Sequence, residues 1–136
     1  MPKPEHKDSH QRDHVEWLRP QEQALLGGEI GVYDARFITL LDELQKEGQI
    51  TSWRRSKDNS PDDSAGRDYW VRVRINEDEV PLSITSTYRL AKYRRLKHPD
   101  IPVIYLQKHP NFGEGLRSEK TIKREILDKA SSYLKG

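Results

Sequence analysis

Residues 66–107, which read GRDYWVRVRINEDEVPLSITSTYRLAKYRRLKHPDIPVIYLQ, decide the fold. Apolar and polar side chains alternate over residues 67–76 and again over 80–85, which predicts two antiparallel strands joined by a short acidic turn. A strongly basic helix is predicted over 88–98, and the continuous apolar run over 101–106 is typical of a strand buried on both faces. Because a helix joins them, the last two strands are predicted to lie parallel.

Helices and one more strand flank this stretch. Residues 34–48 carry apolar side chains at helical spacing, with Asp34 as the predicted N-cap and Gly48 at the closing position. Residues 49–55 are β-branched and aromatic enough for a first strand, and an apolar stripe predicts a last helix over 118–134. The predicted fold class is α/β (α+β), in the order αβββαβα. It comprises a helix-covered three-stranded antiparallel meander, a crossover helix, a fourth buried strand and a final helix.

Length and composition limit the architecture. The chain has 136 residues and a mass of 16.0 kDa, enough for one hydrophobic core. Residues 1–30 are predicted to form a disordered or loosely docked arm and residues 31–136 a single domain, with polar loops over 56–66 and 108–117. The lack of cysteine excludes disulfides and thiolate metal sites, and it favours the cytoplasm. No apolar run reaches the roughly 18 residues of a membrane span, so no membrane partner is expected.

The N-terminal arm leaves two questions open. His6, His10 and His14 are spaced four apart, which would align three metal ligands on a helix. A polar tail is the favoured interpretation, because no apolar residue fixes a helix there. Trp17 and Leu18 contact either a partner or the chain's own core, and the core is favoured.

Positive charge is concentrated in the basic helix, although the net charge of the chain is only +2. Residues 86–109 contain six Lys and Arg against one Asp, a net of +5, whereas residues 1–30 carry a net of −2. With the arginines and tryptophans of the strands, the helix predicts a surface for the phosphates and bases of DNA or RNA. An ordinary solvated surface is the alternative. The predicted nucleic-acid-binding residues are Arg54, Arg55, Arg72, Arg74, Arg89, Lys92, Arg94, Arg95 and Lys97, beside Trp53 and Trp70.

The order of elements over residues 31–134 resembles the core of the PD-(D/E)XK nuclease superfamily, the restriction-endonuclease-like fold. The resemblance implies an aspartate at the start of the second strand and a Glu-x-Lys triplet on the third. In that family the two carboxylates hold Mg²⁺ and the lysine orients a water molecule. Asp68 stands at the first position, but Ser83 and Thr85 replace the glutamate and the lysine. The resemblance therefore implies a degenerate active site, and we expect neither catalysis nor a cofactor.

Three functions remain open. The favoured one is a non-catalytic domain that binds DNA or RNA through its basic helix and sheet face. The second is a protein-interaction or assembly module of the same fold, whose partner is another protein or a second copy of the chain. The third is a Mg²⁺-dependent nuclease with migrated catalytic residues, for which Asp68, Lys92 and Glu43 are the candidates. A double-stranded RNA-binding domain shares the opening order of elements, but it lacks the apolar strand over 101–106.

Overall fold

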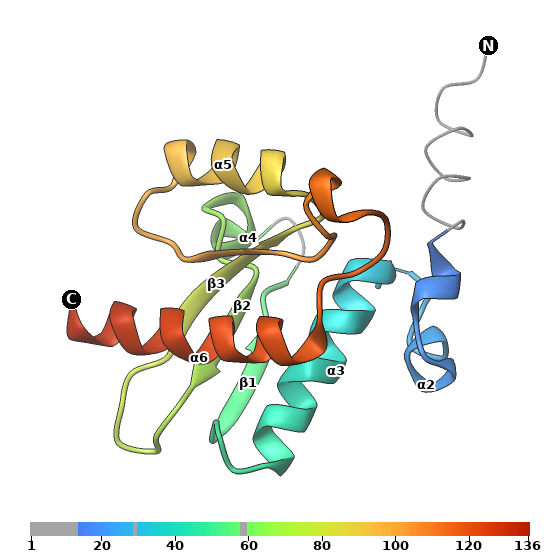
Figure 1. Ribbon diagram of the computed structural model, residues 1–136. Coiled ribbons are helices and arrows are strands. Elements are labelled where there is room, and N and C mark those ends of the chain that lie inside the picture. The colour runs from blue at the N-terminus through green and yellow to red at the C-terminus, as the bar shows by residue number, and fades with distance from the viewer. Residues whose placement is uncertain (1–13, 29, 58–59) are drawn as a thin grey trace. The chain divides into compact units, whose positions relative to one another are not determined.

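The computed structural model describes residues 14–28, 30–57 and 60–136 (Figure 1). Residues 1–13 of the predicted arm, with His6 and His10, lie outside the described residues. Contacts along the chain separate two compact units, one up to Thr39 and one from Leu40 onward. In chain order the elements are η1 (Val15–Trp17), α2 (Pro20–Gln23), α3 (Val32–Lys46), β1 (Ser52–Arg55), α4 (Pro61–Ser64), β2 (Tyr69–Arg72), β3 (Val80–Thr85), α5 (Tyr88–Lys97), β4 (Val103–Tyr105), η2 (Pro110–Phe112) and α6 (Glu119–Lys135).

The N-terminal unit contains a buried ion pair between α2 and the first part of α3. The fully buried Glu22 carboxylate accepts hydrogen bonds from Arg36 Nε at 2.5 Å and from Arg36 Nη2 at 2.9 Å. His14 stacks on Trp17, with ring centroids 3.9 Å apart, and its Nδ1 lies 2.8 Å from the Tyr33 hydroxyl. Both rings are therefore held by contacts within this unit.

The second unit is built on one four-stranded sheet with the strand order β1-β2-β3-β4. β1, β2 and β3 pair antiparallel, with Tyr69 opposite Leu82. β3 and β4 pair parallel, with Ile84 opposite Ile104, and α5 forms the connection between them. The predicted meander and the predicted parallel pairing of the last strand are both confirmed.

Alternation of side chains along the strands gives the sheet two different faces. On the first face, Trp53 Nε1 of β1 donates to Asp42 of α3 at 2.9 Å, and Lys123 of α6 pairs with Glu43 of α3 at 3.0 Å. On the opposite face lies α5 (Figure 1), whose Arg94 Nη1 donates to Ser83 Oγ of β3 at 2.6 Å. The first face forms the core, with the buried strand residues Tyr69, Val71, Val80, Leu82, Ile84 and Ile104 and the buried α6 residues Ile122, Ile126 and Ala130.

The ends of α3 and β2 differ from the predictions. α3 begins two residues before the predicted cap, Asp34, because Ala35 N donates to Gly31 O at 2.9 Å. Asp34 therefore lies in the first turn, where a carboxylate interacts favourably with the helix dipole. β2 is shorter than the strand predicted over 67–76, because residues 73–79 turn the chain toward β3.

The loop predicted over 56–66 contains the short helix α4. The Ser60 hydroxyl accepts a hydrogen bond from Asp63 N at 3.3 Å and caps this helix. The loop predicted over 108–117 likewise contains the turn η2. β3 has the predicted bounds, and α5 and α6 agree to within one residue, with Thr87 and Ser118 as their caps.

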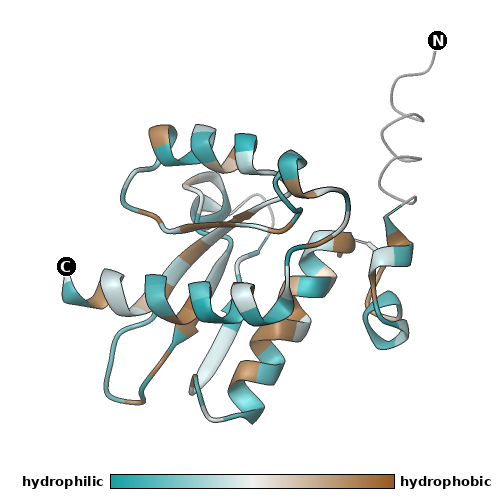
Figure 2. Ribbon diagram, in the orientation of Figure 1, coloured by the Kyte–Doolittle hydropathy of each residue, from teal (hydrophilic) through white to brown (hydrophobic). Residues whose placement is uncertain are grey.

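Hydrophobic residues are concentrated in the strands and on the inner sides of the long helices (Figure 2). α5 differs because it is mainly hydrophilic, and Ala91 is the one buried residue among its ten. In the part of the chain that the structure describes, no helix combines the length and the apolar character that crossing a membrane requires. α5 is thus a surface helix that lies across one face of the sheet.

Candidate nucleic-acid interface

Asp68, Ser83 and Arg94 meet on the sheet face that α5 covers. Asp68 directly precedes β2 and Ser83 lies within β3, so strand alternation points both away from the core. Asp68 Oδ2 accepts hydrogen bonds from Ile84 N at 2.9 Å, from Ser83 Oγ at 3.2 Å and from Arg94 Nη1 at 3.0 Å. Arg94 Nη1 also donates to Ser83 Oγ at 2.6 Å. One guanidinium therefore bridges the two side chains.

Burial shifts the pKa of Asp68, whose side chain is only 15% exposed. Burial raises the pKa of the Asp68 carboxyl, and the hydrogen bond from Ile84 N and the charge of Arg94 offset this only in part. The folded protein therefore binds a proton at Asp68 more tightly than the unfolded chain does. Between the ordinary pKa of about 3.9 and the raised value, this group makes the fold less stable as pH rises.

Replacing Arg94 by methionine is expected to destabilise the fold by about 1–3 kcal/mol at pH 7. This is less than the cost of breaking a fully buried pair, because Arg94 is one-third exposed. The loss arises from an ionised Asp68 without its cation, so it is expected to shrink as pH falls through the pKa of Asp68. Urea unfolding between pH 7.5 and 4.5 measures this dependence.

The matched control is the double variant Asp68→Asn with Arg94→Met. It removes the carboxylate charge as well, and it is expected to recover most of the lost stability and to lose the pH dependence. A loss in Arg94→Met that is the same at every pH would show that the charge of Asp68 is not its cause.

The donors around Asp68 do not fit a divalent cation. Mg²⁺ prefers several oxygen ligands, including carboxylates, whereas Asp68 faces one hydroxyl and a guanidinium that already neutralises it. Thr85, at the position that the resemblance aligns with the lysine, is buried and donates to Thr87 O at 3.1 Å. Among the described residues, no three His, Asp or Glu side chains lie close enough together to hold a metal ion. No metal-dependent step follows from this arrangement.

Glu43 and Lys92, the candidates for migrated catalytic residues, are not brought to Asp68. Glu43 lies on α3, behind the opposite face of the sheet, where it pairs with α6. Lys92 is exposed on α5, and its Nζ lies 5.6 Å from the ring centroid of Tyr88. The α5 cation that reaches Asp68 is Arg94 instead. The three candidates therefore do not form one cluster.

The basic residues of α5 differ in their exposure and in their partners. Arg94 points inward and is used by Asp68 and Ser83. The other four are exposed, and none of them forms an ion pair with a carboxylate of the described residues. These four exposed cations, the outward cations of α5, are Arg89, Lys92, Arg95 and Lys97.

The arginines of the strands are mostly engaged by the protein itself. Arg54 pairs with Glu79 through two nitrogens, each at 3.0 Å, and its guanidinium lies 4.8 Å from the ring centroid of Trp70. Arg72 donates to a backbone carbonyl of the turn between β2 and β3. The two remaining arginines predicted to bind nucleic acid are Arg55, which is half-buried, and Arg74, which is exposed.

Sequence reasoning missed two cations, Arg117 and Lys129, whose charges act on one another. Arg117, which follows β4, lies 4.0 Å over the Tyr105 ring and pairs with Glu125 at 2.6 Å. Lys129 of α6 is half-buried, and burial lowers its pKa, as do the charges of Arg95 and Arg117. For Lys129, the available signal in the sequence was its position beside the apolar stripe of the last helix. The Glu125 carboxylate offsets part of the positive charge of both groups.

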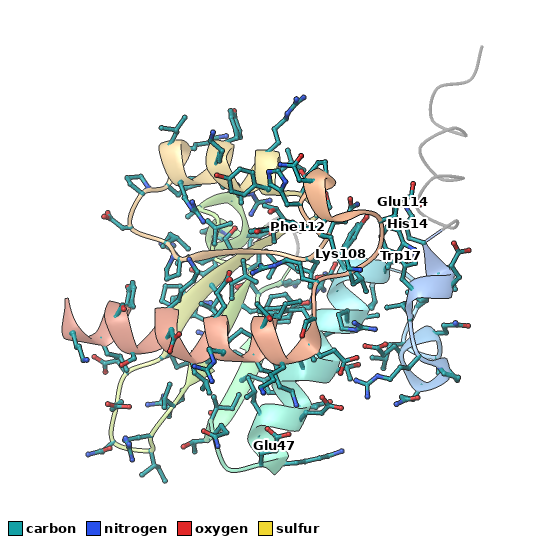
Figure 3. The ribbon with its side chains drawn as sticks, viewed as in Figure 1. His14, Trp17, Glu47, Lys108, Phe112 and Glu114 are labelled. Atoms are coloured by element: carbon teal, nitrogen blue, oxygen red, sulfur yellow. The ribbon has the colours of Figure 1, made fainter. Side chains whose placement is uncertain are left out.

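An open hollow of about 670 Å³ lies beside the first turn of α5. Aromatic rings continue from the sheet into it: Tyr88 contacts Tyr105 and His109, with centroids 5.5 and 5.1 Å apart. His109 contacts Phe112 at 6.2 Å, and Phe112 is 76% exposed on η2 (Figure 3). The residues that line the hollow are Thr87, Tyr88, Arg89, Lys92, His109 and Pro110.

Comparison of the chain with protein-family models, with curated proteins and with solved structures finds no match. The function is therefore inferred from the arrangement of charge, rings and hydrogen bonds in the protein itself.

Proposed function

We propose that this chain is a non-catalytic, nuclease-like domain that binds DNA or RNA through the outward side of α5. The observation that carries the proposal is the set of four exposed cations on one ten-residue helix, without carboxylate partners among the described residues. A nucleic-acid backbone supplies a matching row of anions, and each contact with it releases a condensed counterion.

The distribution of charge along the chain supports a polyanionic partner. Residues 86–136 contain twelve Lys and Arg against five Asp and Glu, a net of +7, which leaves residues 1–85 with a net of −5. A positive net charge in the segment that contains α5 favours the approach of an anionic ligand. Tyr93, which is 60% exposed among the outward cations, offers a ring on which a base can stack.

The hydrogen bonds of Asp68 support binding without cleavage. Arg94 Nη1 lies 3.0 Å from Asp68 Oδ2 and 2.6 Å from Ser83 Oγ. In the superfamily that the sequence resembles, carboxylates at these two positions hold a metal ion. Here a guanidinium supplies the positive charge, and it ties α5 to β2 and β3. The order of the elements is compatible with a restriction-endonuclease-like core.

Salt dependence tests the proposal. Fluorescence anisotropy of a labelled DNA duplex is expected to show binding that weakens as salt is raised. Four phosphate contacts give an expected slope of roughly −3.6 for log affinity against log salt, at about −0.9 for each contact. Absence of binding at low salt, or a slope near zero, would contradict the proposal. The DNA is expected to stay intact with Mg²⁺ or Mn²⁺. Cleavage that disappears in Asp68→Ala would indicate a nuclease instead.

A protein partner is the second candidate, and apolar side chains on α5 favour it. Leu90, Tyr93 and Leu96 are 46%, 60% and 85% exposed. Trp53 and Trp70 contribute less, because each donates its Nε1 hydrogen to a side chain of the same unit. Self-association measured by sedimentation, if lost in Leu96→Glu, would support this function. A monomer at every concentration would count against a homodimer.

A further inference from the structure

The hollow beside the first turn of α5 combines aromatic rings with cations. Tyr88 and His109 line it together with Arg89 and Lys92, and the Lys92 ammonium lies 5.6 Å from the Tyr88 ring centroid. Its volume of about 670 Å³ lies within the range of roughly 300–1,000 Å³ for small-molecule sites. A ligand that fits both features has a flat aromatic part and an anionic part.

Phe112 lies next to the hollow on a hydrogen-bonded turn, where its ring contacts the lining residue His109. Phe112 N donates to His109 O at 2.8 Å, and Asn111 N donates to His109 Nδ1 at 3.2 Å. The turn therefore fixes the backbone that carries the ring, although 76% of the residue is exposed. Because Nδ1 of His109 accepts a hydrogen bond, the neutral imidazole carries its proton on Nε2, which is then a donor. The turn thus presents the ring of Phe112 and the Nε2 donor of His109 together.

We infer that this hollow binds an unpaired nucleotide, so that single-stranded nucleic acid, or a single-stranded tail, is the preferred ligand. The inference rests on the proposed function, because the phosphates of the same strand would contact the outward cations of α5. Bases inside a duplex are stacked on one another and present only their edges. An unpaired base exposes both faces, and aromatic side chains bind such faces with little dependence on sequence.

The experiment compares three labelled DNA probes of equal length at one salt concentration: a single strand, a blunt duplex and a duplex with a single-stranded tail. The wild-type protein is expected to bind the single strand and the tailed duplex more tightly than the blunt duplex. Phe112→Ala is expected to weaken single-strand binding by roughly five- to a hundredfold and to leave blunt-duplex binding unchanged. Tyr133→Ala removes another exposed aromatic ring, on α6, and is the matched control.

The outcomes separate this inference from the proposed function. If Phe112→Ala and the wild type bind the single strand equally well, while duplex binding keeps its salt dependence, the inference is wrong and the proposed function stands. His109→Ala provides a second variant, and it too is expected to weaken single-strand binding selectively. If none of the three probes binds, both proposals fail.

Discussion

Replacing Arg89, Lys92 and Arg95 together by glutamate is expected to weaken nucleic-acid binding by at least roughly 100-fold. All three side chains are exposed on α5, so each is available to a phosphate, and each substitution turns an attraction into a repulsion. The slope of log affinity against log salt is expected to fall by about one for each lost contact. Anisotropy with one labelled DNA across a salt series measures both quantities.

The triple variant is expected to fold normally. α5 contacts the rest of the protein through Tyr88, Ala91 and Arg94, which stay unchanged. Arg95 and Lys129 are both positive and repel each other, so a glutamate at position 95 would attract Lys129 instead. Urea unfolding is therefore expected to give a stability close to that of the wild type, and the loss of affinity can be assigned to the surface of α5.

A second triple variant controls for net charge. Lys46, Lys57 and Lys135 are exposed and lie outside α5, and replacing them by glutamate changes the net charge by the same amount. Binding by this variant is expected to stay within a few-fold of the wild type. An equal loss in both triple variants would mean that affinity follows the overall charge. Unchanged binding in the α5 variant would place the nucleic-acid surface elsewhere on the protein.

The strands of the fold were predictable because burial leaves a strong pattern in them, although β1, β2 and β4 are shorter than predicted. All six residues of β3 are buried, and its bounds are those predicted from residues 80–85. The beginning of α3 and the whole of α4 were not predictable in this way. Both depend on single hydrogen bonds, accepted by Gly31 O and by the Ser60 hydroxyl, and no repeating apolar pattern accompanies them.

Only the residues of the candidate site that lie on the strands, Asp68 and Ser83, could be predicted from the sequence. Asp68 and Ser83 were placed at the start of one strand and within the next, and antiparallel pairing brings their side chains to 3.2 Å. Five cations of α5 look alike in the sequence, and the rotation of the helix about its axis decides which one faces the sheet. Lys92 and Arg94 are two residues apart, about 200° around the helix. The two therefore point in nearly opposite directions, and Arg94 is the one that reaches Asp68.

Replacing Glu22 by alanine is expected to remove about 3–5 kcal/mol from the stability of the N-terminal unit, the cost of breaking a buried ion pair. The Glu22 carboxylate accepts three hydrogen bonds, from Arg36 Nε, from Arg36 Nη2 and from Arg19 N, while Glu22 is 0% and Arg36 5% exposed. Without the carboxylate, a buried guanidinium loses the anion that neutralises it. Separation of α2 from α3 is therefore expected to cost less free energy.

Hydrogen exchange resolves this opening at individual amides. The amides of Gln23 and Leu25, which donate to Arg19 O and Glu22 O, are expected to exchange faster in Glu22→Ala, with the amides of the sheet as an internal reference. Gln21→Ala, at an exposed position of α2, is expected to change stability by less than about 0.5 kcal/mol. A Glu22→Leu, Arg36→Met double variant is expected to restore protection, because apolar residues of similar volume tolerate burial without a charge partner. If Glu22→Ala kept full protection, the packing of apolar side chains, and not this ion pair, would hold α2 in place.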